Sequence, residues 1–364
     1  MLCCRARLSL ALISGRSAYP SLSSTFSTFR DDDVLVGSEL ALNFGSEPVD
    51  VRVVNGDVQG LSLRVVGREG CSNRRSITVR PEPVVDAPGD RTRYVVRMMG
   101  DDTPTSATNP VVCAEIPPRY FGLRIVTGGD VELAGSIKEA RDVLIRTRGG
   151  AISSSGSVTS ETLSLVSDGG AIRAAQVMAN NAVVDADSNN RGIGTGDVHI
   201  GRASCLHLLC KGDRVRIESL ISSAADVRGT TIDVENANTL DGEAALSLRG
   251  RADKACSLRL GGVDGSIVLD DGTRAAVMEV QLNKNARKIE YKTCEATRVS
   301  CFKPQELRLV VDGSGEGDAD DDAESDAESE EAPRCRVVGG KGRVEVTDRG
   351  WRESFLMKMA SCRR

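Results

Sequence analysis

Glycine returns at regular intervals between residues 128 and 172, and each time a Val or Ile stands two positions after it. The first triplet of each unit is Gly129-Asp130-Val131, then Gly150-Ala151-Ile152, then Gly170-Ala171-Ile172. About six residues later comes a second triplet: Gly135-Ser136-Ile137, Gly156-Ser157-Val158, and Ala175-Gln176-Val177, where the glycine is lost. A third apolar cluster follows at 143–145, 163–166 and 183–184. The unit therefore spans about 20 residues and holds three short apolar segments.

Such a period is typical of a solenoid, because one unit cannot bury its own apolar face and must stack on its neighbours. We expect each apolar segment to be a short strand and each glycine to be a corner with a sharp turn or a positive φ. Glycine and β-branched residues recur where a helix would lose stability. With only 3% aromatic residues and 37 glycines, the sequence predicts an all-β fold, a single β-solenoid (parallel β-helix-like) with rungs of about 20 residues.

The predicted organisation has five parts. They are a disordered targeting presequence (1–33), an irregular β region that opens the solenoid (34–120), solenoid rungs (121–311), a disordered acidic insert (312–333) and closing strands (334–360). In the last part Phe355, Met357 and Met359 alternate beside Trp351, which favours a cap for the end of the solenoid.

The first 30 residues contain four Arg, seven Ser and no acidic residue. This composition is typical of a mitochondrial transit peptide, which must be cationic and amphipathic. The alternatives are a plastid or a secretory signal, with LSLALIS as the apolar segment. That run is short, Arg16 follows it closely and no A-x-A cleavage site is evident. The sequence therefore predicts a protein of the mitochondrial matrix, with secretion as the second possibility.

Eleven cysteines are scattered along the chain without a CxxC pair. Two of them fall in the expected presequence, which leaves an odd number for the rest. This pattern is typical of reduced, often buried thiols rather than of a disulfide framework. Reduced thiols agree with a matrix location.

The formal net charge of −5 is concentrated in one segment, because residues 312–331 hold 11 of the 52 acidic residues. The rest of the chain has 47 basic and 41 acidic residues and lacks the basic surface that nucleic-acid binding requires. No apolar run is long enough to span a membrane, so the sequence predicts neither a nucleic-acid partner nor a membrane span. Ser325, three residues before Glu328, is a candidate for an acidophilic kinase.

The segment that leads into the repeat runs VVCAEIPPRYFGLRIVTGGDVELAGSI. It resembles the putative-adhesin (head-GIN-type) β-solenoid domains, in which a strand ending in Ile-Pro leads through a Leu-x-Ile-x-Thr-x-Gly-x-Val strand into glycine-led rungs. The matching residues are Ile116, Pro117, Leu123, Ile125, Thr127, Gly129 and Val131. The resemblance extends over about residues 50–300. The chain is also similar to the eukaryotic members of this family that carry a presequence. It implies a β-helix-like fold and carries no catalytic motif.

Both histidines lie near two cysteines, at His199, Cys205, His207 and Cys210. Imidazole and thiolate are ligands that suit Zn²⁺. Strand alternation would turn Leu206 and Leu208 inward, so that Cys205 and His207 face out while Cys210 faces in. Four ligands would then not converge, and we expect surface histidines and a buried cysteine.

A carboxylate site is the alternative for an enzyme. Carbohydrate-active β-helices use paired acids, and Asp185, Asp187, Asp233 and Glu235 lie on predicted strands or at their edges. Solvated surface charge is the simpler interpretation. The glycines at 192, 194 and 196 lack the spacing of a dinucleotide loop and predict a turn.

These observations favour a non-enzymatic β-solenoid that binds or scaffolds a protein or glycan partner, as a monomer or weak oligomer. No catalytic, cofactor-binding or metal-binding residue is assigned. The alternatives are a carbohydrate-active β-helix enzyme and a structural β-solenoid that stacks end to end into filaments.

Overall fold

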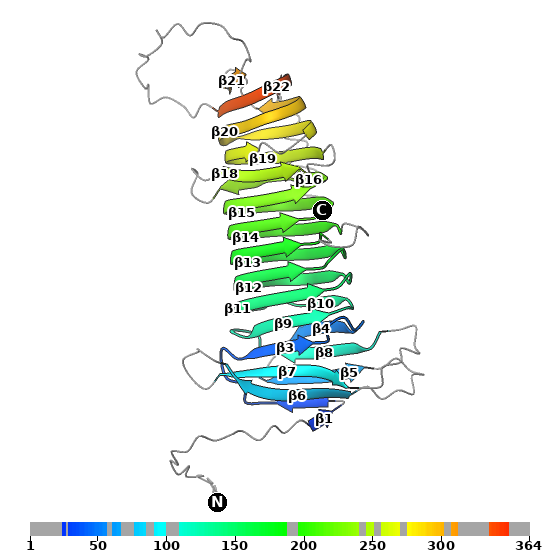
Figure 1. Ribbon diagram of the computed structural model, residues 1–364. Coiled ribbons are helices and arrows are strands. Elements are labelled where there is room, and N and C mark those ends of the chain that lie inside the picture. Colours follow the sequence, from blue (N-terminus) through cyan, green and yellow to red (C-terminus); the bar gives the residue numbers. More distant parts are fainter. Residues whose placement is uncertain are drawn as a thin grey trace, which may run out of the picture.

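The computed structural model describes residues 24–26, 28–56, 60–66, 76–84, 91–99, 109–187, 196–239, 245–250, 256–269, 275–301, 307–311 and 335–348. Every described element is a β-strand, and the strands stack into a tall column with β1–β8 at one end and β20–β22 at the other (Figure 1). None of the described residues forms a helix that could cross a membrane.

The strands of the N-terminal region are β1 (Ser24–Phe26), β2 (Thr28–Asp31), β3 (Glu39–Asn43), β4 (Asp50–Asn55), β5 (Leu61–Val66), β6 (Ser76–Pro83), β7 (Thr92–Met99) and β8 (Val111–Ile116). The regular rungs contain β9 (Gly122–Thr127), β10 (Val131–Ala134), β11 (Ile137–Thr147), β12 (Ile152–Val166), β13 (Ile172–Asp185), β14 (Val198–Lys211), β15 (Arg214–Gly229), β16 (Thr231–Val234) and β17 (Ala237–Thr239). The remaining strands are β18 (Ala245–Gly250), β19 (Cys256–Leu269), β20 (Ala275–Cys301), β21 (Leu307–Val311) and β22 (Cys335–Asp348).

The long strands bend around corners, so that each rung contributes to three parallel sheets. The first face contains β10, β16 and segments 152–154, 172–174, 198–200 and 215–217. The second face contains β17 and segments 158–160, 177–179, 203–205 and 220–222. The third face contains β9, β18 and segments 143–147, 162–166, 181–185, 207–211 and 226–229. The fold predicted from the glycine repeat, an all-β solenoid, is therefore confirmed.

The interior of the column consists of aliphatic side chains stacked in register. On the first face Val131 lies beside Ile152, which lies beside Ile172 on the next rung, and all three are 1% exposed or less. On the second face Val158 and Val177 are fully buried in the same way. The Val or Ile that follows each of these corners therefore points into the core.

Rung length varies while the register holds. Successive positions of the inner row on the first face are Ile152, Ile172, Val198, Val215 and Ile232. The chain needs 20 residues for the first step, 26 for the second and 17 for each of the next two. Stacking therefore fixes which side chains meet, although the number of residues between equivalent positions differs from rung to rung.

A ladder of glycines follows one corner of the column. Its members are Gly129, Gly150, Gly170, Gly196, Gly212 and Gly229, none of which has a positive φ. A Cβ on Gly150 would overlap the carbonyl oxygen of Gly129, and one on Gly170 would overlap that of Gly150. Positive φ occurs at the preceding residues Gly149 (93°) and Gly169 (107°). The expected corner glycines are present, but in this ladder they allow close approach of neighbouring rungs rather than a special φ.

Buried hydroxyl groups line the same corner. Thr127, Thr147 and Ser167 occupy equivalent positions and are all fully buried. The hydroxyls of Thr147 and Ser167 each donate a hydrogen bond of 2.5 Å to the carbonyl three residues later. A buried carbonyl needs such a donor. The Thr or Ser before each Gly pair therefore provides the hydrogen bond that the glycine carbonyl at the corner requires.

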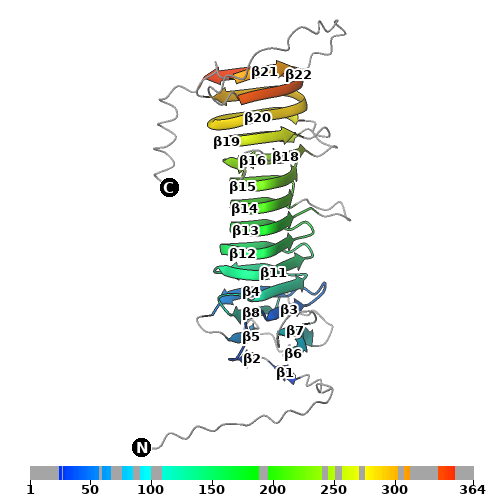
Figure 2. The ribbon, with the colours of Figure 1, turned by 90° about the vertical axis from the view of Figure 1, so that its left-hand side faces the viewer.

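Two of the three faces continue into the N-terminal region. The first face runs from β10 through β4 and β8 to β5 and β2, and the third runs from β9 through β3 and β7 to β6 and β1. Within the described residues the second face starts at the bridge between Arg119 and Lys138. Below this point the column has two layers and is a β-sandwich, as the perpendicular view in Figure 2 shows.

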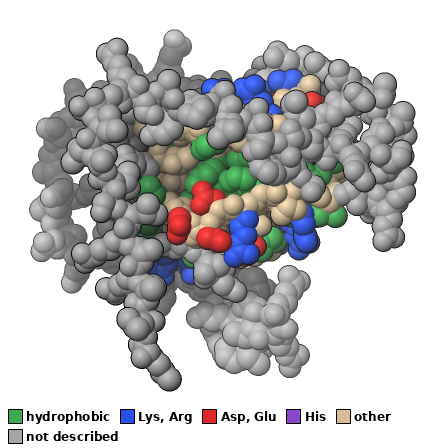
Figure 3. Space-filling view, turned by 90° about the horizontal axis from the view of Figure 1, so that it is seen from below, with side chains coloured by type: hydrophobic (Ala, Val, Ile, Leu, Met, Phe, Trp, Pro, Cys, Tyr) green, Lys and Arg blue, Asp and Glu red, His purple; other side chains and the backbone are tan. Residues whose placement is uncertain are grey.

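The sandwich buries aliphatic side chains between its layers, as the rungs do, and adds aromatic rings. Leu40, Leu61, Leu63 and Ile77 are fully buried. Phe29 on β2 contacts Tyr94 on β7, with ring centroids 6.1 Å apart. The outermost strands pair antiparallel, β5 with β2 and β6 with β1, so strand direction changes toward this end. Seen from the end, apolar side chains lie beside acidic and basic ones (Figure 3).

Two strands lie where the sequence predicted a disordered presequence. Segment 1–33 includes β1, which pairs with β6, and β2, which pairs with β5. The folded part therefore begins by Ser24, and the boundary at residue 33 was placed too late. The half-buried Phe29 provides the physical reason, because its ring packs against the core.

At the opposite end, β20 pairs with β22, and β22 also pairs with β21. The predicted acidic insert (312–333), Ser325 and the predicted cap around Trp351 lie outside the described residues.

Candidate functional site

The structure separates the four residues of the His/Cys cluster. His199 is on the outside of the first face, where its Nε2 lies 3.3 Å from Glu218, and His207 is exposed on the third face. Cys205 and Cys210 point into the core, with exposures of 2% and 0%. Among the described residues, no group of three or more His, Cys, Asp or Glu could hold a metal ion.

Two orientations within this cluster differ from the prediction. Cys205 faces inward and Leu206 is 44% exposed, the opposite of what uniform alternation requires. The reason is a corner: Leu206 and His207 are both exposed, so the alternation restarts where β14 passes from the second face to the third. Leu208 and Cys210 face inward as expected.

Burial controls the chemistry of these two thiols. It raises the pKa of Cys205 to about 11. Burial also raises the pKa of Cys210, and the nearby Asp185 and Cys205 add to that effect. Both groups therefore remain neutral thiols at physiological pH, and a buried neutral thiol is neither a metal ligand nor a nucleophile.

The four candidate carboxylates do not form one site. Asp185 is on the third face, 7% exposed, and pairs with Lys211 at 3.2 Å. Its Oδ1 also accepts a hydrogen bond from the backbone N–H of Asp187. Asp233 is on the first face, and Glu235, just beyond β16, pairs with Arg216 at 2.5 Å. The two acidic pairs thus lie on different sheets, and Asp185 and Glu235 are engaged by basic side chains.

Apolar side chains on the outside of the third face form a surface that the sequence reasoning did not identify. We call this surface the aliphatic strip; its members are Val126, Leu144, Val166, Val183 and Leu209. Each is partly exposed and stands between two residues, one before and one after it in sequence, that are buried. Leu144 and Ser164, Ser164 and Val183, and Val183 and Leu209 are direct cross-strand partners. The strip therefore crosses β9, β11, β12, β13 and β14.

A sequence signal for the strip exists. A sheet with one solvated face alternates apolar and polar residues, but the third-face segments read Val143-Leu144-Ile145 and Ala182-Val183-Val184, and later Leu208-Leu209. The middle residue of such a run must point outward when its neighbours point inward. Uninterrupted apolar runs in a half-solvated sheet therefore predict an apolar outer surface.

Ion pairs border the strip on both sides. Toward the sandwich, Glu39 contacts Arg93 at 3.1 Å and Arg124 at 3.3 Å. Arg146 stands within the strip, as the direct cross-strand partner of both Val126 and Val166, and pairs with Asp168 at 3.1 Å. Further on, Asp185–Lys211 and Asp226–Arg228 continue the mixed-charge border. The strip is therefore a surface of aliphatic side chains that is interrupted by Arg146 and Ser164 and bordered by charges of both signs.

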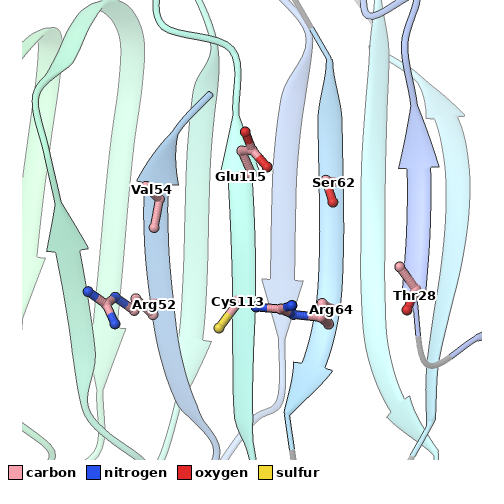
Figure 4. Close-up of a pocket in the computed structure, with 7 residues that line it drawn as sticks. All are labelled: Thr28, Arg52, Val54, Ser62, Arg64, Cys113 and Glu115. Carbon is pink, nitrogen blue, oxygen red and sulfur yellow. The ribbon is translucent and has the colours of Figure 1, made fainter. Parts of the chain in front are cut away.

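A second surface feature is a groove on the outside of the first face, within the sandwich. It has a volume of about 520 Å³ and is lined by Thr28, Arg52, Val54, Ser62, Arg64, Cys113 and Glu115 (Figure 4). These residues come from four neighbouring strands, β2, β5, β8 and β4. They form two outward rows, one with Cys113 between Arg64 and Arg52 and the other with Glu115 between Ser62 and Val54.

No family model and no curated protein matches this chain in sequence. Two solved structures align with it over most of its length. One is a "putative adhesin" from Bacteroides fragilis, with 9% identity over 88% of this chain and 96% of that one and a TM-score of 0.22. The other is a "putative cell adhesion protein" from Clostridium sporogenes, with 9% identity over 90% and 100% of the two chains and a TM-score of 0.18.

Proposed function

We propose that this protein is a non-enzymatic β-solenoid of mitochondria that binds a protein partner on its third face. The aliphatic strip is the observation that carries the proposal. Aliphatic side chains recur at outward positions on five consecutive strands, where a solvated sheet face normally carries polar residues. Contiguous exposed apolar surface rimmed by polar residues is typical of an interaction site.

The chemistry of the strip favours a protein over other partners. Its border contains Glu39, Asp168 and Asp226 together with basic side chains, whereas a polyanion would require basic residues without acidic neighbours. Its apolar members are all aliphatic, and a glycan-binding groove would use aromatic rings to stack on sugars. An apolar centre with a charged rim is the usual anatomy of a protein–protein interface.

The mitochondrial location rests on the composition of the N-terminal segment. The fold adds one constraint: removal of a presequence before Ser24 would leave β1 and β2 intact. A cut after residue 33 would remove both strands together with Phe29, which packs on Tyr94. We therefore expect the mature protein to begin at or before Ser24.

Site-specific photo-cross-linking tests the binding face. A photoreactive residue at Val183 lies in the strip, and the same residue at Met178, 37% exposed on the second face, is the matched control. In cells that express each full-length variant with a C-terminal tag, we expect one defined protein adduct from position 183 and little from 178.

The companion variant Leu144→Gln/Leu209→Gln should reduce capture of that adduct about tenfold, since apolar anchors dominate interface energy. Equal adducts from positions 183 and 178 would contradict the binding face. Recovery of the tagged protein from the secretory pathway would overturn the mitochondrial assignment without affecting the strip.

A carbohydrate-active enzyme is the weaker candidate. It would need two carboxylates across one groove, and Asp185 and Asp233 lie on different faces. The filament alternative would need sheets that are open at their ends. Among the described strands, β1 and β2 are short, with three and four residues, and short edge strands are one way in which proteins avoid end-to-end pairing.

A further inference from the structure

The groove on the sandwich places the thiol of Cys113 beside the guanidinium of Arg64. Cys113 on β8 is opposite Arg64 on β5 and opposite Arg52 on β4. In Figure 4 the side chain of Arg64 extends toward Cys113, while that of Arg52 extends the other way, toward its partner Glu132 at 3.5 Å. Cys113 is partly exposed, so a molecule in the groove can reach its sulfur.

Charges of opposite sign stand on the two outward rows of the groove. Arg64 forms no ion pair with any residue in the described part of the chain. In the other row the Glu115 carboxylate stands next to the position of Ser62. Both rows also carry a hydroxyl group, because Ser62 is the partner of Glu115 and Thr28 is the partner of Arg64. A guanidinium, a carboxylate and hydroxyls around a cavity match a small zwitterion that carries both carboxylate and ammonium groups.

We propose that this groove binds a small zwitterionic disulfide, such as that of a cysteine-containing tripeptide, and that Cys113 forms a mixed disulfide with it. Arg64 holds a carboxylate of the ligand and Glu115 an ammonium group. The ligand's sulfur then lies over Cys113. The site is separate from the aliphatic strip and does not depend on the partner proposed for it.

The reaction is a thiol–disulfide exchange. Cys113 loses its proton to solvent, and its thiolate attacks one sulfur of the ligand disulfide. A new S–S bond forms to that sulfur while the old S–S bond breaks, and the second half of the ligand leaves as a thiolate. Cys113 is oxidised, the leaving half is reduced, and no further oxidant is required. A reduced thiol of the same class reverses the step.

The two buried thiols provide an internal comparison. Cys205 and Cys210 are enclosed by the rungs, and burial raises the pKa of each. Neither can meet a bulky disulfide while the solenoid is folded. Modification of the native protein should therefore reach Cys113 and spare Cys205 and Cys210.

The test measures the rate of mixed-disulfide formation on the reduced, full-length native protein. The two probes are glutathione disulfide, which is zwitterionic, and bis(2-hydroxyethyl) disulfide, which is neutral. Peptide mass mapping locates the adduct. The variants are Arg64→Gln and Glu115→Gln, and the matched control is Arg173→Gln, an exposed arginine on the first face outside the groove.

We expect Arg64→Gln and Glu115→Gln each to slow the reaction of Cys113 with glutathione disulfide about threefold to fivefold, the scale of one solvent-exposed charge contact. The rate with the neutral disulfide should change less, because that probe reports only how the two charges affect the Cys113 thiolate itself, and Arg173→Gln should change neither rate. The proposal is overturned if native Cys113 does not react with glutathione disulfide. It is also overturned if the groove variants slow both probes equally, because the arginine and the glutamate would then not recognise the ligand.

Discussion

The N-terminal sandwich and the rungs above it share two continuous sheets but are held together differently. In the sandwich, strands far apart in sequence pair in both directions, and large side chains such as Phe29 and Tyr94 fill the space between two layers. In the rungs the described strands all pair parallel, and Val, Ile, Leu and Ala side chains stack on their equivalents. The comparison shows that a repeat needs close backbone contact between equivalent positions, whereas the irregular end needs side-chain volume.

The largest expected difference between the regions concerns glycine. In the rungs, Gly150→Ala places a Cβ onto the carbonyl oxygen of Gly129, and the backbones must separate. We expect it to lower the free energy of unfolding by about 3 kcal/mol. In the sandwich, Gly45 has a φ of 63°, and a methyl group added there would meet no atom within 4 Å. Gly45→Ala should therefore cost only about 1 kcal/mol, for the backbone strain.

Urea unfolding of both variants, followed by circular dichroism, measures the two losses. Equal losses of unfolding free energy at the two positions would mean that close backbone contact between rungs does not determine their stability. The proposed difference between the two regions would then be wrong.

Alkaline pH should affect the rungs before the sandwich. A group whose pKa is higher in the folded state adds stability that is complete below its unfolded pKa and is lost as pH rises toward the folded value. The rungs hold Cys205 and Cys210, whose ordinary pKa is 9.0. The sandwich holds Tyr94, whose pKa is raised from 10.0 by burial and by its hydrogen bond to Asp31.

Under reducing conditions we expect the free energy of unfolding to fall from pH 9, by about 1 kcal/mol per pH unit for each buried thiol. Cys210→Ala should flatten this fall from pH 9 upward, and Tyr94→Phe should flatten it only above pH 10. Urea titrations between pH 8 and 11 test the order. The predicted order would be contradicted if Tyr94→Phe already flattened the pH dependence of the unfolding free energy at pH 9.

The smallest expected difference concerns ion pairs. Glu39 is 16% exposed and contacts two arginines on the sandwich side of the third face. Glu235 in the rungs is 41% exposed and contacts one. We expect Glu39→Gln to cost about 1 kcal/mol and Glu235→Gln less than about 0.5 kcal/mol, with both losses reduced in 1 M salt. A larger loss at Glu235 would reverse the ranking of the two regions.

The rungs could be predicted from sequence because their contacts are local and repeated. The spacing from Gly129-x-Val131 to Gly150-x-Ile152 fixes both the period and the inward residues. The sandwich could not be derived in the same way. Pairing of β4 with β8, and of β3 with β7, joins segments that no periodic pattern relates. The reversed orientation of Cys205 and Leu206 was missed because a two-residue alternation cannot show where a strand turns a corner.

The surface features were harder to predict than the core. The strip could have been predicted from the sequence, because an apolar residue between two inward-facing residues of a strand must face outward, as Leu144 and Val183 do. The groove does not, because Arg64, Cys113 and Arg52 become neighbours only through the pairing of β5 with β8 and of β8 with β4. Chemistry that depends on long-range strand pairing is invisible until the pairing is known.

The unequal rung lengths have a consequence for how such a chain can change. Within the 26-residue step from Ile172 to Val198, the Gly196 N–H donates a hydrogen bond of 3.0 Å to the Ala186 carbonyl. Sequence added between these two residues would start and end at almost the same place, so the stacking of neighbouring rungs does not depend on its length. Evolution can therefore lengthen the chain at this corner, and an experimenter can graft a fluorophore or an affinity peptide there without disturbing the stack.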